Sequence, residues 1–95
     1  MPTLPSTTIP ARRADVLAQQ VEPGDTTVLL NPKSGEYYTL DAVGSHAWQL
    51  CDGKNTISEM ATILSQEFDA PSDVIENDIL DLMKDLLDEG LVDAR

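Results

Sequence analysis

Three short segments with strand-like composition follow one another in the first half of the chain, and turn sequences separate them. The segments are residues 16–21, 26–31 and 36–40, and the turns are Pro23-Gly24-Asp25 and residues 32–35. Connections this short join antiparallel neighbours. A three-stranded sheet of this size is stable only when another element covers one of its faces. The remainder of the chain must therefore supply that cover.

Helical signals fill the second half of the chain. Asp41 is a suitable N-cap for a first helix, and Thr56 and Glu59 form a capping-box pattern at the start of a second. Gly90 is placed to end a third. We expect these helices over about 42–51, 57–68 and 72–89. The predicted fold class is α+β, a small winged helix-turn-helix in which a three-stranded antiparallel sheet is followed by three helices.

The length and the N-terminal composition predict the domain organisation. A chain of 95 residues fits one small domain. Residues 1–14 contain three prolines and no hydrophobic period, so we expect a flexible N-terminal segment that packs weakly. The folded domain is expected over residues 15–95, with the apolar pair Leu91-Val92 near its end.

The charge balance restricts the partners. Seventeen acidic residues against six basic ones give a formal net charge of −11. Nucleic-acid phosphates and anionic lipid head groups repel such a surface, so we expect neither nucleic acid nor membrane as a partner. The N-terminus lacks a signal pattern, and no apolar run approaches the ~20 residues of a membrane span. The expected location is cytoplasmic, and the expected partner is basic or neutral.

Few residues in this chain are suited to catalysis. One cysteine, Cys51, and one histidine, His46, exclude an internal disulfide and a multi-cysteine zinc site. Ser45 precedes His46, but neighbours on a helix point about 100° apart and do not readily form a nucleophile–base pair. We therefore predict no enzyme activity of its own, no catalytic residue, no cofactor and no metal.

The third predicted helix is apolar over a wide arc. Seven apolar residues cover roughly 160°, against the ~100° of an ordinary surface helix. They are Ile75, Ile79, Leu80, Leu82, Met83, Leu86 and Leu87, and the acidic residues Asp78, Asp81, Asp85, Asp88 and Glu89 lie opposite. Two interpretations stay open at this point: a deeply buried terminal helix, or a helix that also lines a binding groove.

Two other functional classes fit the residues poorly. A winged helix that reads DNA needs a basic face, yet residues 69–93 hold nine acidic residues and one lysine. A carrier protein needs an Asp-Ser-Leu or Asp-Ser-Met triplet at a helix start, and the chain has neither. A binding module for another protein or peptide remains.

Taken in order, several short motifs resemble the PqqD-like family over about residues 15–93. The motifs are VLL (28–30), GEYYTLDxVG (35–44), AWxL (47–50), DGxxTIxE (52–59) and DIxxLMxxLLxxGLV (78–92). The resemblance implies that residues 15–95 form a peptide-recognition domain. Such a domain binds the leader of a ribosomally synthesised precursor peptide and presents it to a separate enzyme.

The resemblance is greatest to stand-alone members of lasso-peptide biosynthesis, in which the partner is a leader peptidase. Two alternatives are kept: a peptide chaperone for a radical S-adenosylmethionine enzyme, as in pyrroloquinoline quinone synthesis, and a winged-helix module that binds a folded protein. In the family the leader adds as a strand beside the third strand, in a groove against the third helix.

The resemblance also places the expected binding residues. We expect Ile79, Leu82 and Leu86 to pack inward, and Met83 with the acidic residues beside it to receive the leader. Alternation separates Tyr37 and Thr39 from Tyr38 and Leu40 without showing which pair lines the groove. The full set of expected peptide-binding residues is Val28, Leu30, Glu36, Tyr37, Tyr38, Thr39, Leu40, Asp78, Ile79, Asp81, Leu82, Met83, Asp85 and Leu86.

Overall fold

The computed structural model, which describes residues 4–21 and 26–94, contains the predicted three-stranded sheet. Its strands are β2 (Leu17–Val21), β3 (Thr26–Asn31) and β4 (Glu36–Leu40), and β3 lies between the other two. Both pairings are antiparallel, with Gln19 opposite Val28 and Leu29 opposite Tyr38. The bounds of β3 and β4 are those predicted, and β2 begins one residue later than expected. The predicted turn at residues 23–25 lies outside the described residues.

The β3–β4 hairpin closes through a four-residue turn at residues 32–35. Gly35 has a φ of 73°, which an L-residue with a side chain rarely adopts, and its amide donates to the carbonyl of Asn31 at 2.8 Å. Because residue 35 must adopt this conformation, the glycine sets the register between β3 and β4.

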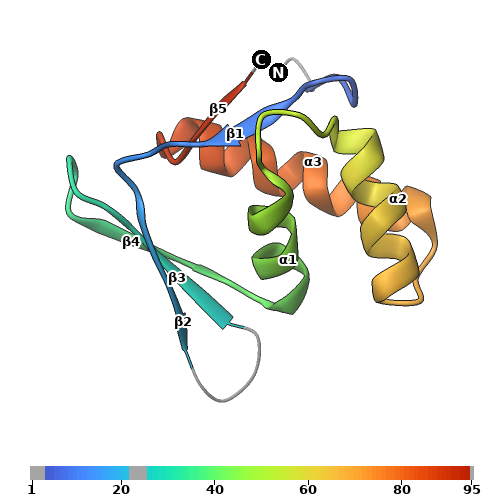
Figure 1. Ribbon diagram of the computed structural model, residues 1–95, viewed down its shortest axis with the longest axis horizontal. Helices are drawn as coiled ribbons and strands as arrows, with labels where there is room; N and C mark the ends of the chain where they lie inside the picture. Colours follow the sequence, from blue (N-terminus) through green and yellow to red (C-terminus); the bar gives the residue numbers. More distant parts are fainter. Residues whose placement is uncertain (1–3, 22–25, 95) are drawn as a thin grey trace.

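Three helices follow the sheet, and α1 packs against one of its faces (Figure 1). They are α1 (Ala42–Leu50), α2 (Ile57–Glu67) and α3 (Ser72–Asp88), with α2 packed along α3. The predicted caps are confirmed: the Asp41 carboxylate accepts the amide of Gly44 at 2.8 Å, and Thr56 and Glu59 form a reciprocal capping box. The predicted α+β fold class is therefore confirmed.

The core lies where the three helices meet one face of the sheet. Its members are apolar side chains that are almost inaccessible to solvent: Leu29, Leu40, Ala47, Trp48, Cys51, Ile57, Met60, Ala61, Leu64, Ile75, Ile79, Met83, Leu86, Leu91 and Val92. Among the described residues, no helix packs on the opposite face of the sheet. The helices are therefore positioned by the first face, and the second face is accessible to solvent.

The prediction that residues 1–14 pack weakly is wrong for the part of this segment that forms β1 (Pro10–Arg12). This strand pairs with β5 (Val92–Ala94), so two short segments near opposite ends of the chain lie side by side (Figure 1). Burial of Pro10 and Ala11 favours this pairing, and the carbonyl of Thr8 accepts the first free amide of α2, that of Ile57, at 3.0 Å. Residues 1–3 lie outside the described residues.

In the described part of the chain, no helix is both long and apolar enough to cross a bilayer.

Candidate functional site

The outer edge of β4 is open. Within residues 4–21 and 26–94, β4 pairs with β3 and with no other strand. The Asn31 carbonyl is directed into the hairpin, because it accepts the amide of Gly35. Main-chain groups alternate in direction along an antiparallel strand, so the amides and carbonyls of Tyr37 and Thr39 point away from β3. This edge can therefore hydrogen-bond an additional extended chain.

A cavity of about 450 Å³ lies beside this edge, between β4, the start of α1 and α3. We call it the β4–α3 groove. Its lining residues are Tyr38, Thr39, Leu40, Asp41, Val43, Gly44, Asp78, Ile79 and Leu82. Leu40 and Ile79 are buried within it, Val43 and Leu82 are half-buried, and the carboxylates of Asp41 and Asp78 are exposed. The groove therefore combines apolar walls with negative charge at its solvent side.

The Tyr38 side chain spans the distance from β4 to α3. Its hydroxyl donates to Oδ2 of Asp85 at 3.4 Å, a long hydrogen bond at the surface. Burial raises the pKa of Tyr38 above 10.0, and the negative charges of Asp85 and Glu89 raise it further. The hydroxyl therefore stays protonated at neutral pH and acts as a donor toward α3.

On α3, Leu82 and Met83 have the opposite orientations to those predicted. Met83 was expected in the groove, but it is fully buried, and the Sγ atom of Cys51 lies 3.6 Å from its Sδ atom. Leu82 was expected to pack inward, but it is half-buried and lines the groove. Adjacent helical residues point about 100° apart, so Leu82 and Met83 cannot both face the core. The contact of Met83 with Cys51, the C-cap residue of α1, fixes Met83 as the inward one. Leu86 packs inward as predicted.

The structure also decides which face of β4 meets the groove. Tyr38 and Leu40 are directed toward the helices, whereas Tyr37 lies on the opposite face of the sheet and is 70% exposed. Val28 and Leu30 share that opposite face with Tyr37 and line a separate shallow hollow there. The expectation that Val28, Leu30 and Tyr37 belong with the groove is therefore not supported by their positions.

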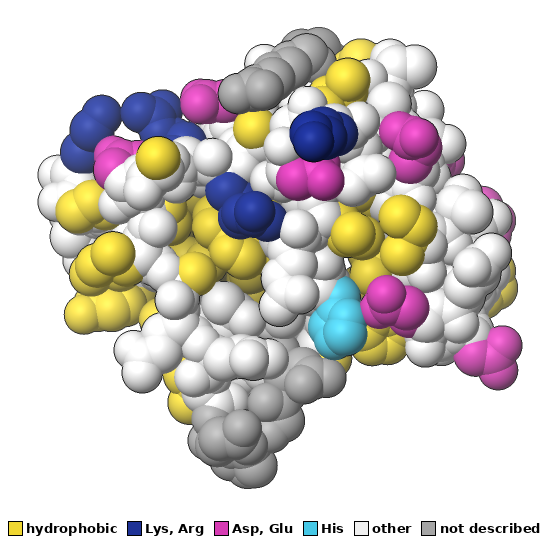
Figure 2. All heavy atoms as spheres, viewed as in Figure 1, with side chains coloured by type: hydrophobic (Ala, Val, Ile, Leu, Met, Phe, Trp, Pro, Cys, Tyr) yellow, Lys and Arg dark blue, Asp and Glu magenta, His cyan; other side chains and the backbone are white. Residues whose placement is uncertain are grey.

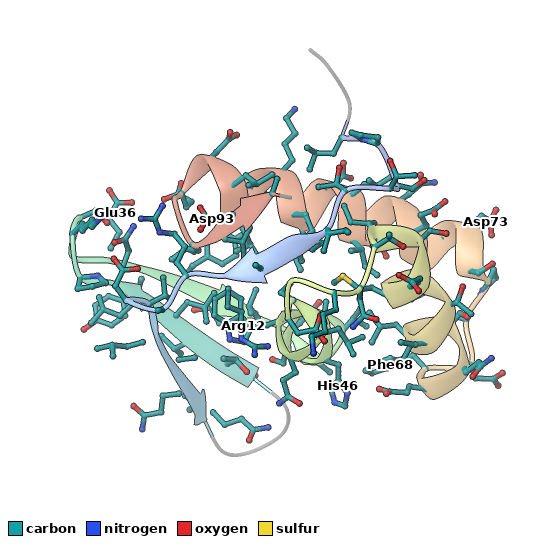
Figure 3. All side chains as sticks on the ribbon, turned by 45° about the horizontal axis from the view of Figure 1, so that its top comes forward. Arg12, Glu36, His46, Phe68, Asp73 and Asp93 are labelled. Atoms are coloured by element: carbon teal, nitrogen blue, oxygen red, sulfur yellow. The ribbon has the colours of Figure 1, made fainter. Side chains whose placement is uncertain are left out.

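Two predicted acidic residues lie apart from the groove lining. Glu36 is exposed at the hairpin end of β4 (Figure 3), and Asp81 is exposed on α3 without lining the groove. Asp85 reaches the groove through its contact with Tyr38. Of the acidic stripe, Asp78 thus lines the groove and Asp85 contacts a residue that lines it.

Three groove residues were missed because each has a structural explanation in the sequence. Asp41 caps α1, Val43 fits the apolar stripe of α1, and Gly44 permits close packing. A Cβ atom on Gly44 would approach the Asp41 carboxylate to 3.2 Å and the Leu40 Cβ atom to 3.3 Å. Their position directly after β4 was the available signal, because residues that follow an edge strand lie at the end of its groove.

The contacts of His46 and Cys51, which were considered for catalysis, are those of structural residues. Nδ1 of His46 lies 2.8 Å from Oε2 of Glu67, and the rings of His46 and Phe68 form a T-shaped pair with 5.1 Å between their centroids (Figure 3). Cys51 is fully buried, and burial raises the pKa of its thiol to about 12. Among the described residues, no three His, Cys, Asp or Glu side chains are grouped so that they could hold a metal ion.

Charge is distributed unevenly over the molecule. On the face shown in Figure 2, Lys and Arg side chains lie mainly on the left and centre, and Asp and Glu side chains mainly to the right, over the helices. Two of the arginines are held by contacts within the domain: Arg12 donates to the carbonyls of Trp48 and Gln49, and Arg13 pairs with Asp93. The groove itself has acidic residues alone among its charged lining residues.

Comparison with known proteins identifies relatives of the chain. The family model for coenzyme PQQ synthesis protein D (PqqD) matches residues 26–92. A PqqA binding protein of Xanthomonas campestris pv. campestris is 34% identical over 92 residues, which are 97% of this chain and 98% of that protein.

Solved structures give the same result. TbiB1 in complex with the TbiA(beta) leader peptide superposes with a TM-score of 0.75 at 26% identity, over 87% of this chain and 94% of TbiB1. The PqqD part of PqqCD from Methylobacterium extorquens, a stand-alone recognition element, superposes with a TM-score of 0.74 at 32% identity, over 88% of this chain and 87% of that one. The sequence match and the shared architecture lead to one assignment: this chain belongs to the PqqD family.

Proposed function

We propose that this chain binds the leader segment of a ribosomally synthesised precursor peptide, which adds to β4 as a further strand in the β4–α3 groove. The observation that carries this proposal is the juxtaposition of the open β4 edge with a cavity of about 450 Å³. The similarity to TbiB1, which was solved with a leader peptide, supports it.

In the groove, main-chain hydrogen bonds supply affinity and side-chain contacts supply selectivity. The outward main-chain groups of Tyr37 and Thr39 bind any extended segment that can form a ladder. Alternate side chains of the bound segment then point toward Leu82 and Val43, which are half-buried in the free protein. An apolar side chain at these positions displaces water from a surface that is already partly apolar.

Electrostatics adds a preference for basic segments. Asp41 and Asp78 lie on the solvent side of the groove, and the whole chain carries a net charge of −11. A leader with Lys or Arg beside its apolar anchors therefore associates faster and with the correct orientation, whereas an acidic segment is repelled. The acidic residues act by attraction and positioning, and none of them is assigned a catalytic role.

The bound leader is then presented to a separate enzyme. One candidate is a leader peptidase, and similarity to lasso peptide synthetase B1 with its leader, at a TM-score of 0.75, favours it. The second is a radical S-adenosylmethionine enzyme of pyrroloquinoline quinone synthesis, which the PqqA binding protein from Xanthomonas favours through its 34% identity. Both candidates use the same groove and differ in the peptide delivered.

Titration calorimetry with two peptides tests the proposal and separates the candidates. The TbiA(beta) leader and the PqqA peptide are each titrated into the protein, together with scrambled versions of the same composition. We expect one native-order peptide to bind at least about tenfold more tightly than its scrambled version, because charge alone does not reproduce the spacing of apolar anchors. Equal affinity for native and scrambled peptides would refute recognition in the groove and favour a module that binds a folded protein through its acidic helix.

A further inference from the structure

The sheet has a second open edge, at β2. In the part of the chain that the structure describes, β2 pairs with β3 alone (Figure 1). All five residues of β2 are exposed. The direction of its main-chain groups follows from the hairpin at the other side of β3. Asn31 faces β4, so Val28 and Leu30 face β2, and their partners Gln19 and Leu17 face back. The amides and carbonyls of Ala18 and Gln20 therefore point outward, along the free edge.

This edge lacks the features that usually prevent strands from pairing. Natural edge strands carry charged residues, proline or a bulge, or are covered by another element. The sequence of β2 is Leu-Ala-Gln-Gln-Val, without charge, proline or glycine, and its register with β3 is continuous over all five residues. Leu17 is 60% exposed and Val21 is 41% exposed, which places two of the large exposed apolar side chains on one short strand.

The arrangement of these residues is self-complementary. Leu17 and Val21 lie on the same face of β2, two positions on either side of Gln19. We propose that β2 pairs antiparallel with β2 of a second copy of this chain, about a two-fold axis at Gln19, so that two sheets join into one of six strands. Leu17 then meets Val21 of the second copy, and the outward main-chain groups of Ala18 meet those of Gln20.

Charge and area determine the strength of this association. The paired strands are uncharged, so the contact itself buries no ion. Each copy nevertheless carries a net charge of −11, and a single five-residue strand is a small contact beside the ~800 Å² per partner of a standard interface. The dimer is therefore weak, forms at high protein concentration and is strengthened by salt, which screens the repulsion between copies.

The two-fold contact leaves the peptide groove accessible. β2 and β4 are the opposite margins of the same sheet, and joining two copies through β2 places both β4 edges at the ends of the six-stranded sheet. Each copy retains its own groove, so the dimer carries two. This inference goes beyond leader binding and does not depend on it.

Cysteine crosslinking at the axis tests the proposal directly. In Gln19→Cys the two introduced thiols lie opposite each other, at a separation that a disulfide can bridge. The matched control is Thr39→Cys, which is exposed on the edge strand at the other margin. Native Cys51 does not interfere, because it is fully buried and its Sγ atom donates to the carbonyl of Ala47 at 3.3 Å.

Under mild oxidation at high protein concentration, we expect at least about tenfold more crosslinked dimer from Gln19→Cys than from Thr39→Cys, because a two-fold axis brings one pair of thiols together. Sedimentation of Gln19→Lys is the second measurement: two like charges then face each other across the axis, and we expect the association constant to fall at least about tenfold. Equal crosslinking of both cysteine variants, or unchanged sedimentation of Gln19→Lys, would overturn the proposal, whereas failure to bind a leader peptide would leave it intact.

Discussion

The two margins of one small sheet have opposite surroundings. β4 carries outward main-chain groups beside a cavity with Leu82 on one wall and Asp78 at its solvent side. β2 instead borders a smaller hollow of about 370 Å³, in which the charged lining residue is Arg12. The strands have the same length and share β3 as their neighbour. An open edge alone supplies hydrogen bonds to any extended chain, including a copy of itself. The apolar and acidic walls beside β4 make the difference, because they add selectivity for apolar and basic side chains to the backbone ladder.

The largest expected effect separates the two margins by removing one outward amide from each. Thr39→Pro removes a donor from the β4 edge without disturbing the β3–β4 ladder, and Gln20→Pro does the same at β2. We expect Thr39→Pro to weaken leader-peptide binding by roughly a hundredfold, through the lost hydrogen bond and the ring in the path of the ladder, and Gln20→Pro to leave it unchanged. Calorimetry measures both affinities, and thermal melts confirm that both variants fold. Equal loss in the two variants would contradict the distinction between the margins.

The walls of the groove are tested by a pair of leucines on α3. Leu82 lines the groove, and Leu80 is also half-buried but contacts the core elsewhere. We expect Leu82→Ala to reduce peptide affinity by about 1 kcal/mol, roughly fivefold, because part of the apolar contact is lost. Leu80→Ala should lower the unfolding midpoint and leave affinity unchanged. If both substitutions weaken binding alike, the effect would come from stability rather than from the groove.

The charge at the groove is tested by a second matched pair. Asp78 lines the groove and Asp81, three residues later, does not, although both are exposed. For a basic peptide at low salt, we expect Asp78→Lys to weaken binding several-fold and Asp81→Lys to have a smaller effect. Raising the salt concentration should reduce the difference, since screening acts on exposed charges. Identical losses would mean that net charge matters and position does not.

The smallest expected effect concerns Tyr38, which joins β4 to α3 across the groove. Its pKa in the folded state is raised above 10.0 by burial and by Asp85, so the unfolded chain loses the phenolic proton first. The stabilisation is therefore complete below pH 10 and is lost as the pH rises through the folded-state pKa. We expect Tyr38→Phe to be less stable by about 0.5 kcal/mol at pH 7, with a smaller difference at pH 11, in urea unfolding. A difference that does not change with pH would contradict the role of the hydroxyl.

Local signals predicted most of the fold. The bounds of β3 and β4 follow from β-branched and aromatic residues between turns, and the capping box at Thr56 and Glu59 marked the start of α2. The pairing of β1 with β5 was not predictable in this way. It joins two three-residue segments from opposite ends of the chain, and neither has a period of its own.

The groove was predicted in place but not in detail. Alternation correctly separated Tyr37 from Tyr38, but the covered face depends on where α1 packs, which no local pattern contains. The apolar arc of α3 included both Leu82 and Met83, and a helix that is apolar over so wide an arc fits more than one rotation. The contact between Met83 and Cys51 fixes that rotation, and it is a tertiary contact between residues 32 positions apart.

Amide hydrogen exchange with and without a bound leader peptide tests the central claim most directly. Because β4 and β2 are the edge strands of the sheet, we expect the outward amides of Tyr37 and Thr39 to exchange freely in the absence of a partner, as should those of Ala18 and Gln20 when the protein is dilute. With peptide bound in dilute solution, we predict slower exchange at Tyr37 and Thr39 and unchanged exchange at Ala18 and Gln20. Peptide binding that slows exchange at the β2 amides, or at neither margin, would contradict strand addition to β4.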